Sequence, residues 1–418
     1  MAQEANSINP TVRCMSLLPL LWGLTAVASG EKAPNEIVRS AVDVIEHHYL
    51  YADTNSAWPI ARDHLLHGDY RNSAEAYLAL IRELNRLGDS ELNLISTAEL
   101  TELQKDTTGQ RIGVGLVEFA IDRNPGGEAR IVTPIFGTPA AEAGVHSGDI
   151  LEAVNDKPTK TMTHEEIIDE LRRQVAGHTV LDLRRGTTPI RVALNPIETK
   201  LIPVQVEIKT DEGIRIGYIR ILEFTPEAGH QVRLAVSTLE SDSVAAYILD
   251  LRNNPGGLLS SAVAAASAFT SGTLGFVVHQ NGKRQPIESS EGSLTKKALI
   301  VLINDGTASA AEVLTAALKD QARATIVGMR SYGRGQAQMY YPLGTAYGII
   351  VPSAVMQSPS RNTFKGTGLI PDIEVPSNSL RIATAATKED SIFARALTIL
   401  ENNCPPSGAA CAVDRAAN

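Results

Sequence analysis

Hydrophobic positions change their spacing along this chain. From Asn35 to about Gln104, apolar residues recur every three or four positions, which predicts a small helical region. From residue 198 onward, continuous apolar runs occur instead, at Val244–Leu251 and Ala298–Ile303, and each leads into a glycine-containing turn and a helical pattern. Such runs are typical of strands buried on both faces. The second half of the chain therefore predicts a layered core built from βαβ units.

Two further stretches complete the expected elements. Residues 227–241 have the amphipathic spacing of a helix, and residues 340–375 return to a strand-like pattern. With 418 residues and 43% hydrophobic content, the chain can bury a large core and form two or three domains. The expected fold class is α/β, in a multidomain α+β arrangement.

The N-terminal 28 residues have the pattern of a signal peptide. The apolar stretch Leu17–Ala28 is far shorter than the roughly 20 residues needed to span a bilayer. The small residues Ala26 and Ala28 predict cleavage before Ser29, so we expect an exported protein. Two alternatives stay open, an uncleaved amphipathic leader and a true start at Met15.

Charge and cysteine content limit the partners. The formal net charge is −9 and no basic cluster interrupts it, which argues against nucleic acid and favours a polypeptide substrate. Cys404 and Cys411 flank a Pro/Gly loop and form either a small disulfide or two free thiols on a tail. No Cys/His cluster has metal spacing, and the adjacent His47 and His48 would not share a helix face. We expect no metal and no cofactor.

Residues 110–197 form a unit with a different pattern. The stretch GTPAAEAGVHSGDILEAVND at 137–156 resembles the GSPAxxAGxxxGDxIxxIN signature of bacterial PDZ domains, and residues 164–175 predict the helix beside the groove. A turn whose free N–H groups are suited to a peptide carboxylate precedes it. That turn is formed by Gly113, Val114, Gly115 and Leu116. An ordinary β-sandwich or linker domain is the alternative.

Ser309 is the first candidate for chemistry. It follows the strand-like run 298–303 and the turn NDGT at 304–307, which places it at the N-terminus of a helix. Free N–H groups and the positive end of the helix dipole are suited there to stabilising an alkoxide or a tetrahedral oxyanion. A serine among alanines is otherwise a helix cap or a small packing residue.

The stretch LDLRNNPGG at 249–257 is the second candidate. Pro255 stiffens the turn, and Gly256 and Gly257 let backbone N–H groups approach a ligand with no Cβ in the way. The same glycines can also simply shape a tight turn, and the two roles are compatible. We expect Asp250 and Arg252 to brace the loop rather than take part in chemistry.

The third stretch, SYGRGQAQ at 331–338, completes a set with a family resemblance. Arg334 lies 25 residues after Ser309, and Gln338 lies four residues after Arg334. The three stretches resemble, in order and spacing, the motifs N-x-G-[ST]-A-S-A-[SA]-E, LDLRNNPGG and [TS]-[FY]-G-K-G-x-x-Q of the C-terminal processing peptidases, or tail-specific proteases. The resemblance extends over roughly residues 35–375. Residues 88–116 are similar to the approach to the PDZ domain in the cyanobacterial and plastid branch.

The resemblance implies a role for each of these residues. Ser309 falls on the nucleophile, and the amide of Ala310 would complete an oxyanion hole with that of Gly256 or Gly257. Gln338 falls on the glutamine that orients the base, and Arg334 on the base itself. The resemblance also implies an order of domains along the chain. A helical region at 33–105 and an inserted PDZ domain precede a ClpP/crotonase-like protease core at 198–400, and a tail follows at 401–418.

Arg334 departs from the family pattern, which has lysine at this position. A buried lysine can lose its proton because desolvation lowers its pKa, but a guanidinium stays protonated. General-base assistance is typically worth about 10²–10⁴ in rate. Three interpretations follow: a pseudoprotease, a Lys→Arg form of an active enzyme, or a protease that uses another base.

Candidates for another base are poor. Lys319 lies on the expected Ser309 helix, ten residues on and well out of register with Ser309. Lys365 lies in the family-like stretch FKGTGLIPD and is expected to be structural or to face the substrate. Glu312 lies one turn from Ser309, where a carboxylate usually bonds the amides of the first turn.

The sequence thus predicts an exported serine-type endopeptidase, in the periplasm or the thylakoid lumen. By the resemblance it recognises and cleaves the free C-terminal tails of polypeptides, and the plastid-like stretch points to a photosystem II reaction-centre precursor. The main alternative is an inactive scaffold that binds tails. A crotonase-type acyl-CoA enzyme is disfavoured, because the PDZ insertion and the Ser309 motif have no place in it. Peripheral association with a membrane and the oligomeric state stay open.

Overall fold

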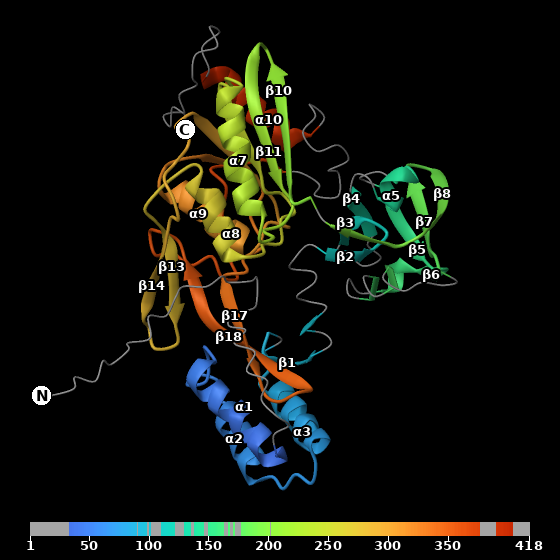
Figure 1. Ribbon diagram of the computed structural model, residues 1–418, viewed down its shortest axis with the longest axis vertical. Coiled ribbons are helices and arrows are strands. Elements are labelled where there is room, and N and C mark those ends of the chain that lie inside the picture. Colours follow the sequence, from blue (N-terminus) through green and yellow to red (C-terminus); the bar gives the residue numbers. More distant parts are fainter. Residues whose placement is uncertain are drawn as a thin grey trace, which may run out of the picture.

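The structure is a computed structural model of the chain (Figure 1). It describes residues 33–89, 91–97, 100–101, 110–121, 129–134, 138–145, 149–162, 166–167, 170–171, 177–200, 202–376 and 390–403. The expected signal peptide and the Cys404–Cys411 pair lie outside these ranges. No helix in the described ranges is long and apolar enough to cross a bilayer.

Three helices form the predicted helical region near the N-terminus. They are α1 (Pro34–His48), α2 (Trp58–His67) and α3 (Ser73–Arg86). Proline in the first turn starts α1, and the Asn72 side chain caps α3 by accepting from Glu75 N. Their apolar faces share one buried cluster with Leu343, Ile349 and Val351 from the second half of the chain. The region is therefore anchored on the second half of the chain.

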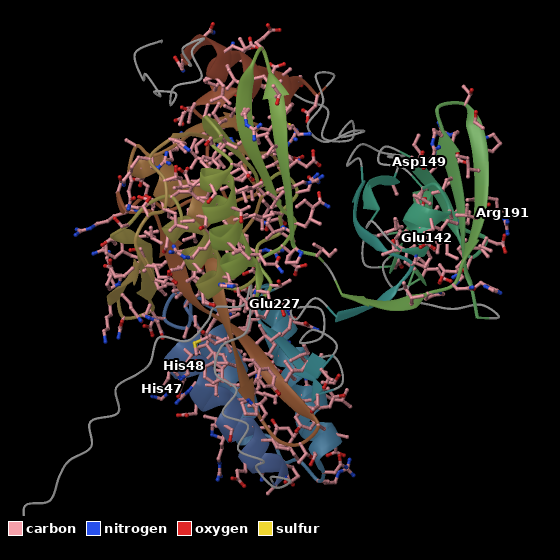
Figure 2. The ribbon with its side chains drawn as sticks, turned by 45° about the horizontal axis from the view of Figure 1, so that its top comes forward. His47, His48, Glu142, Asp149, Arg191 and Glu227 are labelled. Carbon is pink, nitrogen blue, oxygen red and sulfur yellow. The ribbon has the colours of Figure 1, made fainter. Side chains whose placement is uncertain are left out.

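The predicted PDZ-like unit is an antiparallel β structure beside the core (Figure 1). Its elements are β2 (Gln110–Gly113), β3 (Leu116–Ile121), β4 (Ala129–Pro134), α5 (Pro139–Glu142), β5 (Ile150–Val154), β6 (Lys157–Pro158), η1 (Thr159–Thr161), β7 (Thr179–Arg185), β8 (Thr188–Leu194) and β9 (Ile197–Lys200). One sheet runs in the order β3-β4-β5-β7-β8, and β2 pairs with β9. The buried Asp149, labelled in Figure 2, pairs with Arg185 at 2.7 Å.

The core contains a six-stranded sheet in the order β10-β11-β12-β15-β16-β19. Its strands are β10 (Val204–Asp211), β11 (Ile214–Ile221), β12 (Ala246–Asp250), β15 (Ala298–Ile303), β16 (Thr325–Gly328) and β19 (Ile373–Glu374). All neighbouring strands are parallel except β10 and β11. One face packs on α7 (Ala228–Ser241), α8 (Leu259–Ser267) and α9 (Ala310–Asp320), and the other on α10 (Ser391–Asn403).

A second sheet joins the core to the helical region. It contains β1 (Asn93–Ser96), β13 (Thr273–His279), β14 (Arg284–Glu288), β17 (Gln336–Pro342) and β18 (Tyr347–Gln357). Strand β1 comes from the N-terminal third of the chain and pairs with β18, which carries the helical region against the core (Figure 1). The sequence pattern did not predict this pairing.

The expected elements of the core agree with the structure, with small differences. The two apolar runs are β12 and β15, parallel and fully buried as predicted, and the amphipathic stretch is α7. Residues 358–372 carry no strand, so the strand-like expectation for 340–375 was only partly right. Helix α10 ends at Asn403, three residues into the predicted tail. The ClpP/crotonase likeness and the domain boundaries stay predictions.

Candidate active site

Ser309 is the N-cap of α9, directly after β15 and a tight turn, which confirms its predicted place at a helix N-terminus. Its backbone has φ +54° and ψ −119°, a conformation that residues other than glycine rarely adopt. The side chain is only 3% exposed. Strained backbone of this kind persists only where the surroundings over-determine it, and it is concentrated at functional sites.

Reciprocal hydrogen bonds connect the Ser309 loop to the loop after β12. Asn304 Oδ1 accepts from Asn253 N at 2.8 Å, and Asn304 Nδ2 donates to Asn253 Oδ1 at 2.7 Å. Thr307 Oγ1 donates to Leu251 O at 2.8 Å. Because these donors and acceptors are buried, breaking any of them leaves an unsatisfied polar group. The two predicted motifs therefore form one rigid unit.

Gly256 and Gly257 pack closely against neighbouring segments, which only a residue without a side chain can do here. A Cβ on Gly256 would lie 2.7 Å from the Cβ of Ser309, and one on Gly257 would lie 2.4 Å from Phe224 O. Gly256 donates its amide to Asn254 Oδ1 at 2.9 Å. The amides of Gly257 and Ala310 have no acceptor within the described ranges. Of the two glycine amides proposed by the sequence, that of Gly257 is the one available to a ligand.

Glu312 connects the Ser309 loop to the loop that carries Arg334. Its Oε2 accepts from Ser309 N at 2.9 Å and from Arg334 N at 2.8 Å. Its Oε1 accepts from Ser331 Oγ at 2.5 Å and Gly333 N at 2.8 Å. Burial raises the pKa of Glu312 above its ordinary value, against these four hydrogen bonds, which favour the ionised form.

The sequence suggested only part of this role. Glu312 does bond an amide at the start of its helix, as expected, but the three contacts with residues 331–334 join segments that are about twenty residues apart. The residue type and the capping position were the only local signals. The Glu312 Oε2 atom thus bridges the backbone nitrogens of Ser309 and Arg334, because it accepts a hydrogen bond from each.

Arg334 and Gln338 occupy the two ends of the third motif. The Arg334 guanidinium lies 5.4 Å from the Tyr332 ring centroid, a cation–π contact, and has no hydrogen-bond acceptor or ion-pair partner in the described part of the chain. Gln338 lies in β17 opposite Pro352, just after an irregularity in the register, and is 9% exposed. The Arg334 backbone is thus held to the Ser309 loop through Glu312, and its half-buried guanidinium has no counter-charge among the described residues.

The other candidate bases have different partners. Lys319 Nζ donates to Ile370 O at 2.6 Å and pairs with Asp372 at 2.8 Å, so its proton is held in place. Lys365 Nζ donates to the Tyr51 hydroxyl in the helical region. Its amine therefore points toward that region, which fits the expected structural or substrate-facing role.

Asp250 and Arg252 make contacts that fit the expected bracing role. The Arg252 guanidinium bonds both oxygens of Asp250 and reaches Asp390, just before α10, at 2.6 Å. Although burial alone would raise it, the Arg252 guanidinium holds the pKa of Asp250 below its usual value. Tyr218 donates to the same carboxylate at 2.8 Å. The loop is thereby tied to the helix behind the sheet.

The predicted carboxylate turn, residues 113–116, lies between β2 and β3. Val114 is buried, and its carbonyl accepts from Ala140 N at 2.9 Å, at the start of α5. Gly115 has φ +89°, and a Cβ there would lie 2.0 Å from Thr138 Oγ1. Only part of the expected groove helix, 164–175, is described, and within it Ile167 and Leu171 are buried in the core of the unit.

The histidine pair has no shared site. His47 bonds Asp43 O at 2.8 Å, whereas the His48 ring stacks on Tyr341 with the ring centroids 4.6 Å apart, so the two side chains have different partners; both are labelled in Figure 2. Within the described ranges, no three His, Cys, Asp or Glu side chains are grouped so as to hold a metal.

Comparison with known proteins places this architecture. The profile of "Peptidase family S41" matches residues 215–375, and that of "PDZ domain" matches residues 130–185. A carboxyl-terminal-processing protease of Synechocystis sp. is 31% identical over 348 residues, covering 82% of this chain and 81% of that protein. Carboxyl-terminal-processing peptidase 3, chloroplastic, of Arabidopsis thaliana is 30% identical over 337 residues, covering 76% of this chain and 64% of that protein.

Solved structures give the same result. A structure named photosystem II D1 C-terminal processing protease has a TM-score of 0.65 and 26% identity, and covers 87% of this chain and all of that one. A putative S41 protease from Bacteroides fragilis has a TM-score of 0.60 at 18% identity, covers 87% of this chain and 97% of that one, and supports the fold alone.

Proposed function

Because the chain belongs to the C-terminal processing proteases of peptidase family S41, a family of serine-type peptidases, we propose that Ser309 is its nucleophile. The observation that carries this assignment is the strained, buried Ser309 at the N-terminus of α9, against Gly256. Its Oγ would attack the carbonyl carbon of the scissile bond. The amides of Gly257 and Ala310 would donate hydrogen bonds to the developing oxyanion. As the peptide C–N bond breaks, the leaving amine would take the proton lost by the Ser309 hydroxyl.

Covalent labelling tests this assignment directly. A serine-reactive fluorophosphonate should label Ser309 in preference to other serines, and Ser309→Ala should abolish that label. Labelling that survives in Ser309→Ala would assign the nucleophile elsewhere.

Proton transfer depends on position 334. We propose that Arg334 occupies the base position, with Gln338 orienting it, and that the chain is a slow peptidase because a guanidinium cannot take the serine proton. The alternative function, an inactive scaffold that binds tails, is favoured by one specific observation. The Arg334 guanidinium has no ion-pair partner in the described part of the chain and would hold a peptide carboxylate.

We propose that substrates are polypeptides with free C-terminal tails. The PDZ match supports this, as do relatives named for carboxyl-terminal processing. The turn formed by residues 113–116 would hold the terminal carboxylate, and the helix that the sequence predicts at 164–175 would border the tail. The structural similarity to a photosystem II D1 processing protease supports a reaction-centre precursor as one substrate.

Tail binding should depend on the terminal carboxylate. Peptides with a free C-terminal carboxylate should bind Ser309→Ala protein at least about tenfold more tightly than the same peptides amidated, because backbone N–H groups lose a charged acceptor. Fluorescence anisotropy would measure both affinities. Equal binding of the acid and the amide would remove residues 113–116 from this role.

We also propose that the protein is exported, to a periplasm or a thylakoid lumen. The support is the apolar stretch Leu17–Ala28 with its small-residue cleavage pattern, together with relatives from cyanobacteria and chloroplasts. N-terminal sequencing of protein from its native host should find a mature start near Ser29. An intact Met1 on cytosolic protein would contradict this proposal.

A further inference from the structure

A polar cavity, largely open to solvent, lies where the helical region meets the loop that carries Arg334. Its volume is about 370 Å³. Tyr49, Tyr51 and Asp89 line it from the helical region, and Gln336 and Lys365 line it from the core. A hydrogen bond joins the two sides of the cavity, because Gln336 Nε2 of the core donates to the Tyr51 hydroxyl of the helical region at 2.9 Å. The cavity therefore belongs to both regions and exists only when they are docked.

The cavity is next to the proposed base position. Gln336 is two residues after Arg334 and begins β17. A Cβ on Gly335 would lie 2.7 Å from the backbone nitrogen of Lys365, so the Lys365 backbone packs directly against the neighbour of Arg334. A polypeptide passing the Arg334 loop can thus place a side chain or its terminus in this cavity.

Lys365 supplies an ammonium that lacks a counter-charge. Its Nζ donates to the Tyr51 hydroxyl and lies 4.3 Å from the Tyr51 ring centroid. No carboxylate forms an ion pair with it among the described residues. Burial lowers the pKa of Lys365, as expected for a half-buried ammonium. Two of its N–H donors remain for a ligand.

Asp89 is the other charge in the cavity, and it already has partners. It accepts from the Tyr49 hydroxyl at 3.0 Å through Oδ2 and from Glu91 N at 2.9 Å through Oδ1. Each oxygen of Asp89 therefore has a donor within the protein, whereas the acceptor of the Lys365 ammonium among the described residues is a neutral hydroxyl and not a carboxylate. The hydroxyl of Tyr51, which accepts from two donors, keeps its own proton for the same ligand.

We propose that this cavity is a subsite for a carboxylate of the polypeptide substrate, bound by Lys365 Nζ and the Tyr51 hydroxyl. This inference rests on the proposed function, because it places a substrate tail beside the Arg334 loop. The carboxylate comes either from an Asp or Glu side chain within the tail or from the tail's own C-terminus. The subsite would make the helical region part of substrate selection.

Peptide binding to the full chain with Ser309→Ala tests the subsite without turnover. The probes are fluorescent alanine-rich peptides that carry one Glu, or one Gln, at successive positions, each with a free or an amidated C-terminus. At one position we expect Glu to bind about tenfold more tightly than Gln, the scale of a hydrogen bond between charged groups. A terminal source would show instead as a Lys365-dependent loss on amidation.

Variants assign the effect to this cavity. Lys365→Met should remove the carboxylate preference, and Tyr51→Phe should reduce it. Lys283→Met, at an exposed lysine before β14, should leave it unchanged, and Asp89→Asn should strengthen it by removing the competing negative charge. Two results would overturn the subsite. In one, Glu and Gln peptides bind alike and so do free and amidated C-termini; in the other, Lys365→Met keeps the preference for a carboxylate. If no peptide binds at all, the proposed function falls with it.

Discussion

Arg334→Lys should raise peptidase activity by about 10² or more, because a lysine supplies the base that the guanidinium cannot. The surroundings already favour this. The backbone at 334 is held to the Ser309 loop through Glu312, and Gln338 is nearly buried in β17. A partly buried lysine there would have a lowered pKa and a free amine within the working pH range. The measurement is kcat/KM on a tail peptide with a free C-terminus.

Two controls isolate the effect. The gain should vanish in Ser309→Ala/Arg334→Lys. Arg330→Lys, at an exposed arginine that bonds Thr367 O at 2.9 Å, should leave activity unchanged. If the unmodified chain cleaves tails as well as the lysine variant does, another group acts as the base and the assignment of position 334 is wrong.

Glu312→Gln should both destabilise the protein and disable Ser309. An amide keeps one acceptor oxygen and places an NH₂ group against two of the four donors that now face the carboxylate. Leaving buried donors unsatisfied costs about 1–3 kcal/mol each, so we expect a loss of about 3 kcal/mol in the free energy of unfolding. Urea denaturation measures the stability, and the rate of fluorophosphonate labelling measures Ser309.

A graded comparison separates this effect from general damage. Ser331→Ala removes one of the four donors and should reduce stability and labelling by less than Glu312→Gln does. Glu36→Gln, in the exposed first turn of α1, should change neither. A folded Glu312→Gln protein that labels at the unmodified rate would show that the carboxylate does not position the nucleophile.

Local sequence determined much of the site. Apolar runs of strand length, each followed by a turn, identified β12 and β15, because burial on both faces leaves a continuous hydrophobic signature. The same signature placed Ser309 at the start of α9, where short-range geometry decides the backbone. The glycines of the second motif, Gly256 and Gly257, were recognisable because a backbone segment that packs closely against another leaves no room for a Cβ. The spacing between motifs was also enough to identify Arg334 as the residue at variance with the family.

Contacts between distant segments came only from the folded chain. The pairing of β1 with β18 left no local pattern, since β1 has only four residues and no short turn joins it to its distant partner to fix the register. The choice of Gly257 over Gly256 depends on a hydrogen bond to Asn254. Glu312 looked like a helix cap until folding brought residues 331–334 to its carboxylate, where Ser331 and Gly333 bond Oε1 and Arg334 bonds Oε2. The Lys365 cavity needed two regions to dock, because Lys365 lies in the core and the Tyr51 hydroxyl that accepts from it lies in the helical region.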